Sequence, residues 1–216
     1  MDGACGHREC YAGQREKLAT LPNIITTVRT VGSLLLVALA VTDDSQASLV
    51  AAIAVYWVGD IADGWIARLT NTETRTGAVL DILCDRLGCA TCYFAFAVFH
   101  PNMWPPIIVF LLQFMVIDDY LSLAFQRWPL SSPNYFYLID PVIWRLNWSP
   151  LAKMTNSAAL LFAMVLTGDA LLPTTLALAV GGVKIWSVLR LLKLPHNALI
   201  MCAKSSSPDR LISSTD

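Results

Sequence analysis

Apolar residues dominate six stretches of the chain, and short polar segments separate most of them. The apolar stretches cover residues 23–41, 48–67, 78–99, 104–125, 151–167 and 171–192. A helix needs about 20 residues to cross a hydrocarbon core about 30 Å thick, so each stretch is long enough to span a bilayer. Polar turn residues lie at 42–45, 100–102 and 168–169. The pattern predicts an all-α, polytopic membrane protein with six transmembrane helices.

The two ends of the chain are more polar than this central domain, which we place at residues 21–193. Residues 1–20 have no apolar run followed by small residues, so we expect no cleavable signal peptide. Residues 8–20 predict a short juxtamembrane helix with Tyr11 and Leu18 toward lipid, or else a partly ordered polar tail. Residues 194–216 include the run Ser-Ser-Ser-Pro-Asp-Arg and predict a disordered tail.

Composition agrees with a single membrane domain. Hydrophobic residues make up 56% of the chain and charged residues 14%, whereas soluble domains carry about 25% charged residues. We therefore expect membrane lipids as partners and no nucleic acid.

Lysine and arginine are unevenly distributed among the connections. They occur before the first stretch (Arg8, Arg15, Lys17), between the second and third (Arg68, Arg75), between the fourth and fifth (Arg127, Arg145), and at the end of the chain (Arg190, Lys193, Lys204, Arg210). The three alternate connections contain neither residue. Because basic residues concentrate on the cytoplasmic side, we expect both termini to lie there.

Four carboxylates interrupt the second and third apolar stretches. Asp63 and Asp81 each lie four residues inside the expected membrane boundary, about 6 Å deep at 1.5 Å per residue. Asp60 and Asp85 lie roughly 10–12 Å deep by the same rise. Residues three or four apart share a helix face, so each pair can point toward the other helix. Charged groups in a membrane segment are costly, which indicates a functional site near the cytoplasmic surface.

Oxygen ligands alone favour a hard divalent cation such as Mg²⁺ or Mn²⁺. One or two such ions would bridge a phosphate group. Gly64, Ala67 and Gly77 leave room for a ligand beside the carboxylates, and Arg68 is placed to pair with a phosphate. The alternative is structural: an aspartate can pair with a neighbouring arginine, and glycines can serve only close helix packing.

The carboxylates belong to a longer pattern, Asp60-x-x-Asp63-Gly64-x-x-Ala67-Arg68, eight residues, Gly77-x-x-x-Asp81-x-x-x-Asp85. This pattern resembles the signature of the CDP-alcohol phosphatidyltransferases at all eight fixed positions. The segment Leu21-Pro22-Asn23-Ile-Ile-Thr26-Thr-Val-Arg29 also resembles the first helix of the phosphatidylglycerophosphate and cardiolipin synthase members. The resemblance covers residues 20–192.

The resemblance implies an enzyme of phospholipid biosynthesis that transfers a phosphatidyl group from CDP-diacylglycerol to an alcohol and releases CMP. It implies that two Mg²⁺ or Mn²⁺ ions are held by Asp60, Asp63, Asp81 and Asp85. The CDP moiety would be bound by Asp60, Gly64, Ala67, Arg68 and Gly77. Asp85 would also be the general base, and a homodimer is compatible with the family.

The acceptor is less well defined. Arg29, Asp118 and Lys153 are candidate acceptor-binding residues, and we favour an acceptor of the glycerol 3-phosphate type. Inositol phosphate and phosphatidylglycerol are the alternatives. The basic residues could instead snorkel to the interface or pair with Asp118 and Asp119, and we expect Lys184 to snorkel. The aromatic-rich connection at 127–150 suits a lid in the membrane interface.

Two other classes of protein have intramembrane carboxylates or this topology. A small cation- or proton-coupled transporter would place its carboxylates near the bilayer midplane, in two related halves. A catalytically silent membrane partner would not need all eight motif positions.

Overall fold

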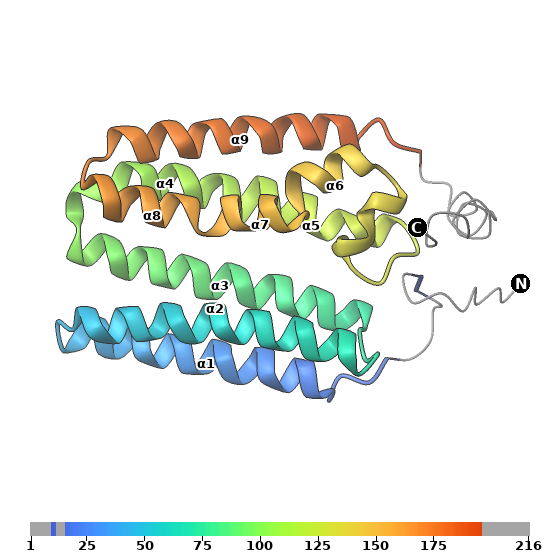
Figure 1. Cartoon of the computed structure of the whole chain (residues 1–216), viewed down its shortest axis with the longest axis horizontal. Coiled ribbons are helices and arrows are strands. Elements are labelled where there is room, and N and C mark those ends of the chain that lie inside the picture. The colour runs from blue at the N-terminus through green and yellow to red at the C-terminus, as the bar shows by residue number, and fades with distance from the viewer. Residues whose placement is uncertain (1–9, 12–15, 196–216) are drawn as a thin grey trace, which may run out of the picture.

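The computed structural model describes residues 10–11 and 16–195, and this part of the chain is a bundle of helices (Figure 1). The elements are α1 (Leu21–Thr42), α2 (Gln46–Leu69), α3 (Arg75–Phe99), η1 (Pro101–Met103), α4 (Trp104–Leu112), η2 (Gln113–Asp118), α5 (Asp119–Leu123), η3 (Ala124–Arg127), η4 (Pro133–Leu138), α6 (Pro141–Asn147), α7 (Pro150–Ser157), α8 (Ala159–Thr167) and α9 (Leu171–Leu191). The beginning of α1 and the end of α9 lie at the same end of the bundle.

Five helical segments are long and apolar enough to cross a membrane. They are Leu21–Thr42, Gln46–Leu69, Arg75–Phe99, Pro101–Arg127 and Leu171–Leu191. A sixth span is available as the pair Pro150–Asn156 and Ala159–Thr167, which is bent by 44° at its junction. The all-α polytopic prediction is therefore confirmed, but the fifth expected span is broken rather than straight.

The fourth span is continuous but not uniformly α-helical. Residues Gln113–Asp118 form a π-helical turn, and Ala124–Arg127 end the span as a 3₁₀ helix. π turns inside α-helices are rare and frequently lie at functional sites. Here the turn ends at Asp118, one of the predicted acceptor-binding residues.

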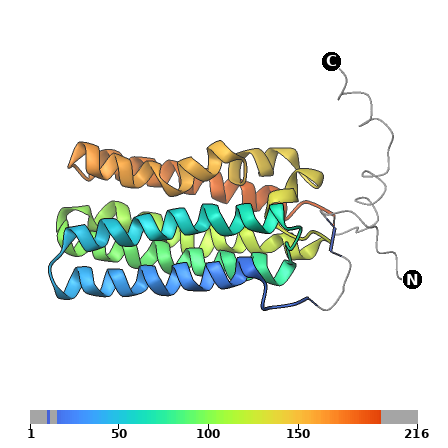
Figure 2. The ribbon, with the colours of Figure 1, turned by 60° about the horizontal axis from the view of Figure 1, so that its bottom comes forward.

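Helices α1, α2 and α3 run side by side, with α8 and α9 on the opposite side of the bundle (Figure 2). Side chains and small residues bring the first three helices close together. The Ser33 hydroxyl on α1 donates to the Ala52 carbonyl on α2 at 3.0 Å. A Cβ on Gly88 of α3 would lie 3.0 Å from the Tyr56 ring of α2. The site described below lies among these three helices.

The connection at 127–150 packs onto the bundle as η4 and α6. Phe136 and Trp148 are buried in a cluster with Trp128 and Leu130, so much of the expected interfacial lid belongs to the core. Asp140 is the N-cap of α6, and its carboxylate binds Arg190 of α9 at 2.7 Å.

Burial alone would raise the pKa of the Asp140 carboxyl. Hydrogen bonds from Arg190 and from the Ile143 and Val142 backbone outweigh burial and lower that pKa below its usual value.

The ends of the chain are described only in part. Residues 10–11 and 16–20 contain no helical turn, and residues 8–9 and 12–15 of the expected juxtamembrane helix lie outside the described residues. Tyr11, predicted to face lipid, donates its backbone N–H to the Pro129 carbonyl at 3.0 Å and lies beside Arg75, 4.8 Å from its ring centroid to the guanidinium carbon. The expected disordered tail lies outside the described residues from residue 196 onward.

Candidate functional site

Four carboxylates from two helices converge on one guanidinium group from a third. Asp60 and Asp63 come from α2, Asp81 and Asp85 from α3, and Arg29 from α1. The Arg29 Nε donates to Asp63 Oδ2 at 2.8 Å. Its Nη2 lies 2.7 Å from Asp81 Oδ1, 2.8 Å from Asp85 Oδ1 and 3.3 Å from Asp60 Oδ1. The spacing in the sequence places all four carboxylates on the facing sides of α2 and α3, as a helix repeat requires.

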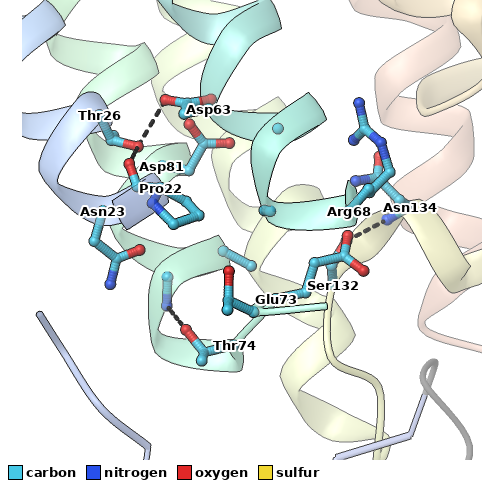
Figure 3. A pocket seen from close by; sticks show the side chains of 15 residues that line it. Pro22, Asn23, Thr26, Asp63, Arg68, Glu73, Thr74, Asp81, Ser132 and Asn134 are labelled. Carbon is cyan, nitrogen blue, oxygen red and sulfur yellow. Dashed lines mark hydrogen bonds between the residues drawn. The ribbon is translucent and has the colours of Figure 1, made fainter. Parts of the chain in front are cut away.

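Asp63 is the most deeply anchored of the four. Its side chain is 3% exposed, whereas those of Asp60, Asp81 and Asp85 are 42%, 38% and 27% exposed. The Thr26 hydroxyl on α1 donates to Asp63 Oδ2 at 2.6 Å, a contact that Figure 3 shows. Thr26 had no assigned part in the sequence analysis, although it belongs to the segment that resembles the family. Its hydroxyl fixes Asp63, while the other three carboxylates are only partly buried.

The cluster fits a hard divalent cation. One oxygen each from Asp60, Asp63 and Asp81 lie within 4.8 Å of one another. Four carboxylates against one guanidinium leave an excess of negative charge in a partly buried site, and such an excess is costly without further cations. Oxygen-only ligands are those that Mg²⁺ and Mn²⁺ prefer.

A glycine lets Arg29 reach the carboxylates. The stem of Arg29 lies against Gly59, where an added Cβ would be 2.5 Å from Arg29 Cβ and 2.6 Å from its Cδ. The guanidinium carbon of Arg29 lies 5.6 Å from the centroid of the Tyr56 ring, and Tyr56 belongs to α2, as Gly59 does. Sequence reasoning missed Gly59, although its position directly before Asp60 is a signal that could have drawn attention to it.

A first cavity of about 480 Å³ opens beside Asp63 and Asp81 (Figure 3). It is lined by four residues of the predicted CDP site: Gly64, Ala67, Arg68 and Gly77. A Cβ on Gly77 would lie 2.7 Å from both Asn23 Oδ1 and Thr74 Oγ1, so only glycine leaves this wall open. Thr74 caps α3 by accepting the Gly77 N–H at 2.9 Å, which fixes the glycine in place. Asp60, the fifth predicted CDP-binding residue, does not line this cavity.

A second cavity of about 940 Å³ lies on the other side of the carboxylates. It is lined by Asp60, Asp81 and Asp85, and by polar side chains from the π turn, α6 and α7. Asp81 and Asn134 line both cavities, so the two spaces meet at the carboxylate cluster. The arrangement gives two ligands separate access to one acidic centre.

The predicted acceptor-binding residues do not all lie together. Lys153 and Asp118 line the second cavity, with the Lys153 Nζ donating to Asn134 Oδ1 at 2.6 Å. Arg29 lines neither of the two cavities and faces the four carboxylates instead. Its guanidinium contacts Asp60 and Asp85, which line the second cavity, but Arg29 itself does not line that cavity.

The expectation for Lys184 is wrong. Its side chain is 1% exposed and binds Asp118 Oδ1 at 2.5 Å, so it does not snorkel. Asp118 also accepts from Arg86 Nη2 at 2.6 Å, and Arg86 Nε lies 3.2 Å from Asp119. The ion pair with Asp118 explains how a lysine is held inside the bundle.

The chain is similar to a known protein family over most of its length. A family model described as CDP-alcohol phosphatidyltransferase matches residues 19–189. Proteins named "Putative cardiolipin synthase" from Mycobacterium bovis and from two strains of Mycobacterium tuberculosis are 28% identical over 113 residues. The match covers 52% of this chain and 54% of each relative, so the chain spans about half the length of the curated relatives it matches. No solved structure matches the chain significantly.

The contact between Gly59 and Arg29 predicts a large effect of a small substitution. Gly59→Ala forces its methyl group into the Arg29 stem, which separates α1 from α2 or displaces the guanidinium. Overpacking of this kind typically costs about 1–3 kcal/mol. Thermal unfolding in detergent should show a clearly lower midpoint.

Gly182→Ala on α9 is the matched control, because nothing lies within 4 Å of the added methyl group. We expect it to leave the midpoint unchanged or slightly raised. Equal midpoints for the two variants would contradict the tight contact at Gly59.

Proposed function

Because the chain belongs to the CDP-alcohol phosphatidyltransferase family, we propose that it transfers a phosphatidyl group from CDP-diacylglycerol to an alcohol and releases CMP. The observation that carries the proposal is the meeting of two cavities at a cluster of four carboxylates. A transferase with two substrates needs separate access for donor and acceptor, and a centre that both can reach.

We assign the metal-binding role to Asp60, Asp63, Asp81 and Asp85, with two Mg²⁺ or Mn²⁺ ions. The excess negative charge of the cluster and its oxygen-only donors support this assignment. When bound, the ions would neutralise the diphosphate of the donor and the CMP leaving group.

The donor head group is assigned to the first cavity. Gly64, Ala67 and Gly77 leave room for the cytidine and diphosphate, and Arg68 at the rim pairs with phosphate oxygens. The motif also assigns Asp60 to the CDP-binding residues. Because Asp60 lines the second cavity, it would contribute to CDP binding by holding the metal.

Asp85 is proposed as the general base. It lines the second cavity and not the first, so an acceptor hydroxyl there can approach its carboxylate. The acceptor oxygen forms a bond to the phosphatidyl phosphorus while the bond from that phosphorus to CMP breaks. The hydroxyl proton passes to Asp85.

We assign the acceptor to the second cavity, with Lys153 on its phosphate and Asp118 on its hydroxyl side. The amide and hydroxyl groups of Asn134, Asn147 and Ser122 along the wall suit a polyol. A glycerol 3-phosphate type acceptor is our first choice. Inositol phosphate and phosphatidylglycerol are the alternatives.

The site is proposed to open to the cytoplasm, with both termini on that side. The support is the distribution of lysine and arginine along the chain. Neither residue occurs in the connections 43–45, 100–103 and 168–170, at the opposite end of the bundle. A homodimer is part of the same proposal by analogy with the family alone.

The activity itself is tested by CMP release. Purified protein is given CDP-diacylglycerol, Mg²⁺ or Mn²⁺, and a panel of glycerol 3-phosphate, inositol phosphate and phosphatidylglycerol. We expect CMP with one acceptor, and a decrease in kcat of about 10²-fold or more in Asp85→Asn, since general bases contribute on that scale.

The control is Asp169→Asn, an exposed carboxylate in the turn before α9 that lines neither cavity. It should leave the rate unchanged. Absence of CMP with every acceptor would refute the enzyme and favour a cation- or proton-coupled transporter, while an undiminished rate in Asp85→Asn would refute the assigned base.

The acceptor assignment predicts a selective effect at Lys153. Removal of a charge-assisted hydrogen bond to phosphate costs about 1.5–3 kcal/mol, which corresponds to a rise of about tenfold or more in KM. Lys153→Met should therefore raise the KM of the acceptor and leave that of CDP-diacylglycerol within about twofold. Steady-state kinetics with each substrate varied in turn measures both.

Lys193→Met, at an exposed lysine just beyond α9, is the comparison variant. It should change neither KM. A Lys153→Met enzyme in which both KM values rise equally would show that Lys153 supports the fold rather than the acceptor.

A further inference from the structure

We infer that Arg29 is a built-in competitor of the divalent ion, holding the carboxylate oxygens until the ion displaces it and thereby setting the affinity for metal. This inference rests on the metal-binding role proposed above. It concerns a residue that the eight-position motif does not include.

The contacts of Arg29 lie on one edge of its guanidinium. Nε and Nη2 face all four carboxylates, whereas Nη1 is buried without a hydrogen-bond partner among the described residues. Nη2 has two hydrogens but three carboxylate oxygens within 3.3 Å. A single nitrogen surrounded by oxygens from two helices occupies the place of a coordinated cation. The oxygens it holds are those that the ion needs.

The position of the guanidinium is built into the fold. The Arg29 side chain is 3% exposed, its stem is held against Gly59, and the Tyr56 ring lies behind it. No rotation about a solvent-exposed side chain is needed to bring it to the carboxylates. The arginine therefore supplies the local cation for four carboxylates that would otherwise repel one another while no divalent ion is bound.

A second buried arginine belongs to a charge-balanced network in the same protein. Arg86 and Lys184 together pair with Asp118 and Asp119, two positive charges against two negative ones. The Arg86 guanidinium also stacks over the Phe114 ring, 3.8 Å from its centroid. That network is neutral and needs no ion.

Arg29 differs from this network in its charge balance. It compensates only part of the charge of four carboxylates, so the site it occupies still attracts a divalent ion. A positive charge that the ion must displace from the carboxylates weakens the binding of that ion. Removal of the charge should consequently tighten the binding of metal while it destabilises the protein without metal.

The test measures Mn²⁺ binding without any substrate, from the electron paramagnetic resonance signal of free Mn²⁺. We compare the full chain in detergent with Arg29→Gln, and with Arg145→Gln as a control that removes one exposed charge on α6. We expect a Kd about tenfold lower for Arg29→Gln and a change below twofold for Arg145→Gln. In EDTA, Arg29→Gln should unfold at a lower temperature than the unsubstituted protein, and saturating Mn²⁺ should narrow the difference.

A second measurement uses the unsubstituted protein and does not depend on the folding of Arg29→Gln. The Nε–H resonance of Arg29, identified by its loss in Arg29→Lys, is followed during titration with Mg²⁺. A saturable shift over the concentration range of metal binding supports displacement of the guanidinium. A resonance that does not move at saturating Mg²⁺ overturns the inference.

The outcomes separate this inference from the proposed function. Asp81→Asn removes one of the proposed metal ligands. If the unsubstituted protein binds no Mn²⁺, or if Asp81→Asn does not abolish its Mn²⁺ binding, both the metal site and the competitor role are refuted. If such binding is present but Arg29→Gln binds Mn²⁺ no more tightly, only the role of Arg29 is refuted.

Discussion

Repulsion among four carboxylates between two helices of a membrane protein is the constraint on which the rest of this structure depends. Asp60 and Asp63 on α2 face Asp81 and Asp85 on α3, in surroundings where an uncompensated charge costs several kcal/mol. Helix α1 contributes Arg29, which offsets part of this repulsion, and Gly59 on α2 leaves room for the Arg29 side chain to reach the carboxylates. The negative charge that Arg29 leaves uncompensated is the physical basis for expecting divalent ions. The packing of the first three helices and the chemistry of the site therefore both follow from the same cluster of carboxylates.

The same helix carries two kinds of buried charge with different consequences. On α3, Asp81 and Asp85 bind Arg29, whereas the adjacent Arg86 binds Asp118 of the π turn and Asp119 of α5. The network in which Arg86 and Lys184 pair with Asp118 and Asp119 is neutral, and it links α3 to the π turn, α5 and α9. It holds the wall of the second cavity in place, so a structural network supports the surface against which an acceptor would lie. Charge balance, rather than burial alone, distinguishes the carboxylate cluster proposed to bind metal from the Arg86 network that supports the cavity wall.

The sequence predicts the main parts of this arrangement because they follow from short-range periodicity. Apolar runs define the spans, and spacings of three and four residues place each pair of aspartates on one helix face. The position of Arg29 could not be predicted in this way, because it depends on how closely α1 approaches Gly59. The burial of Lys184 likewise depends on a partner, Asp118, on another helix. The bend in the fifth span, the π turn and the packing of η4 and α6 are tertiary features with no repeating pattern in the sequence.

The most direct test of the account is the location of a divalent ion in the protein. Anomalous diffraction from crystals grown with Mn²⁺ identifies that ion independently of activity. The account predicts anomalous density enclosed by the carboxylates of Asp60, Asp63, Asp81 and Asp85, with the Arg29 Nη2 no longer in contact with Asp81 and Asp85. The account is contradicted if crystals saturated with Mn²⁺ show no anomalous density at this position and Arg29 is still bound to the four carboxylates.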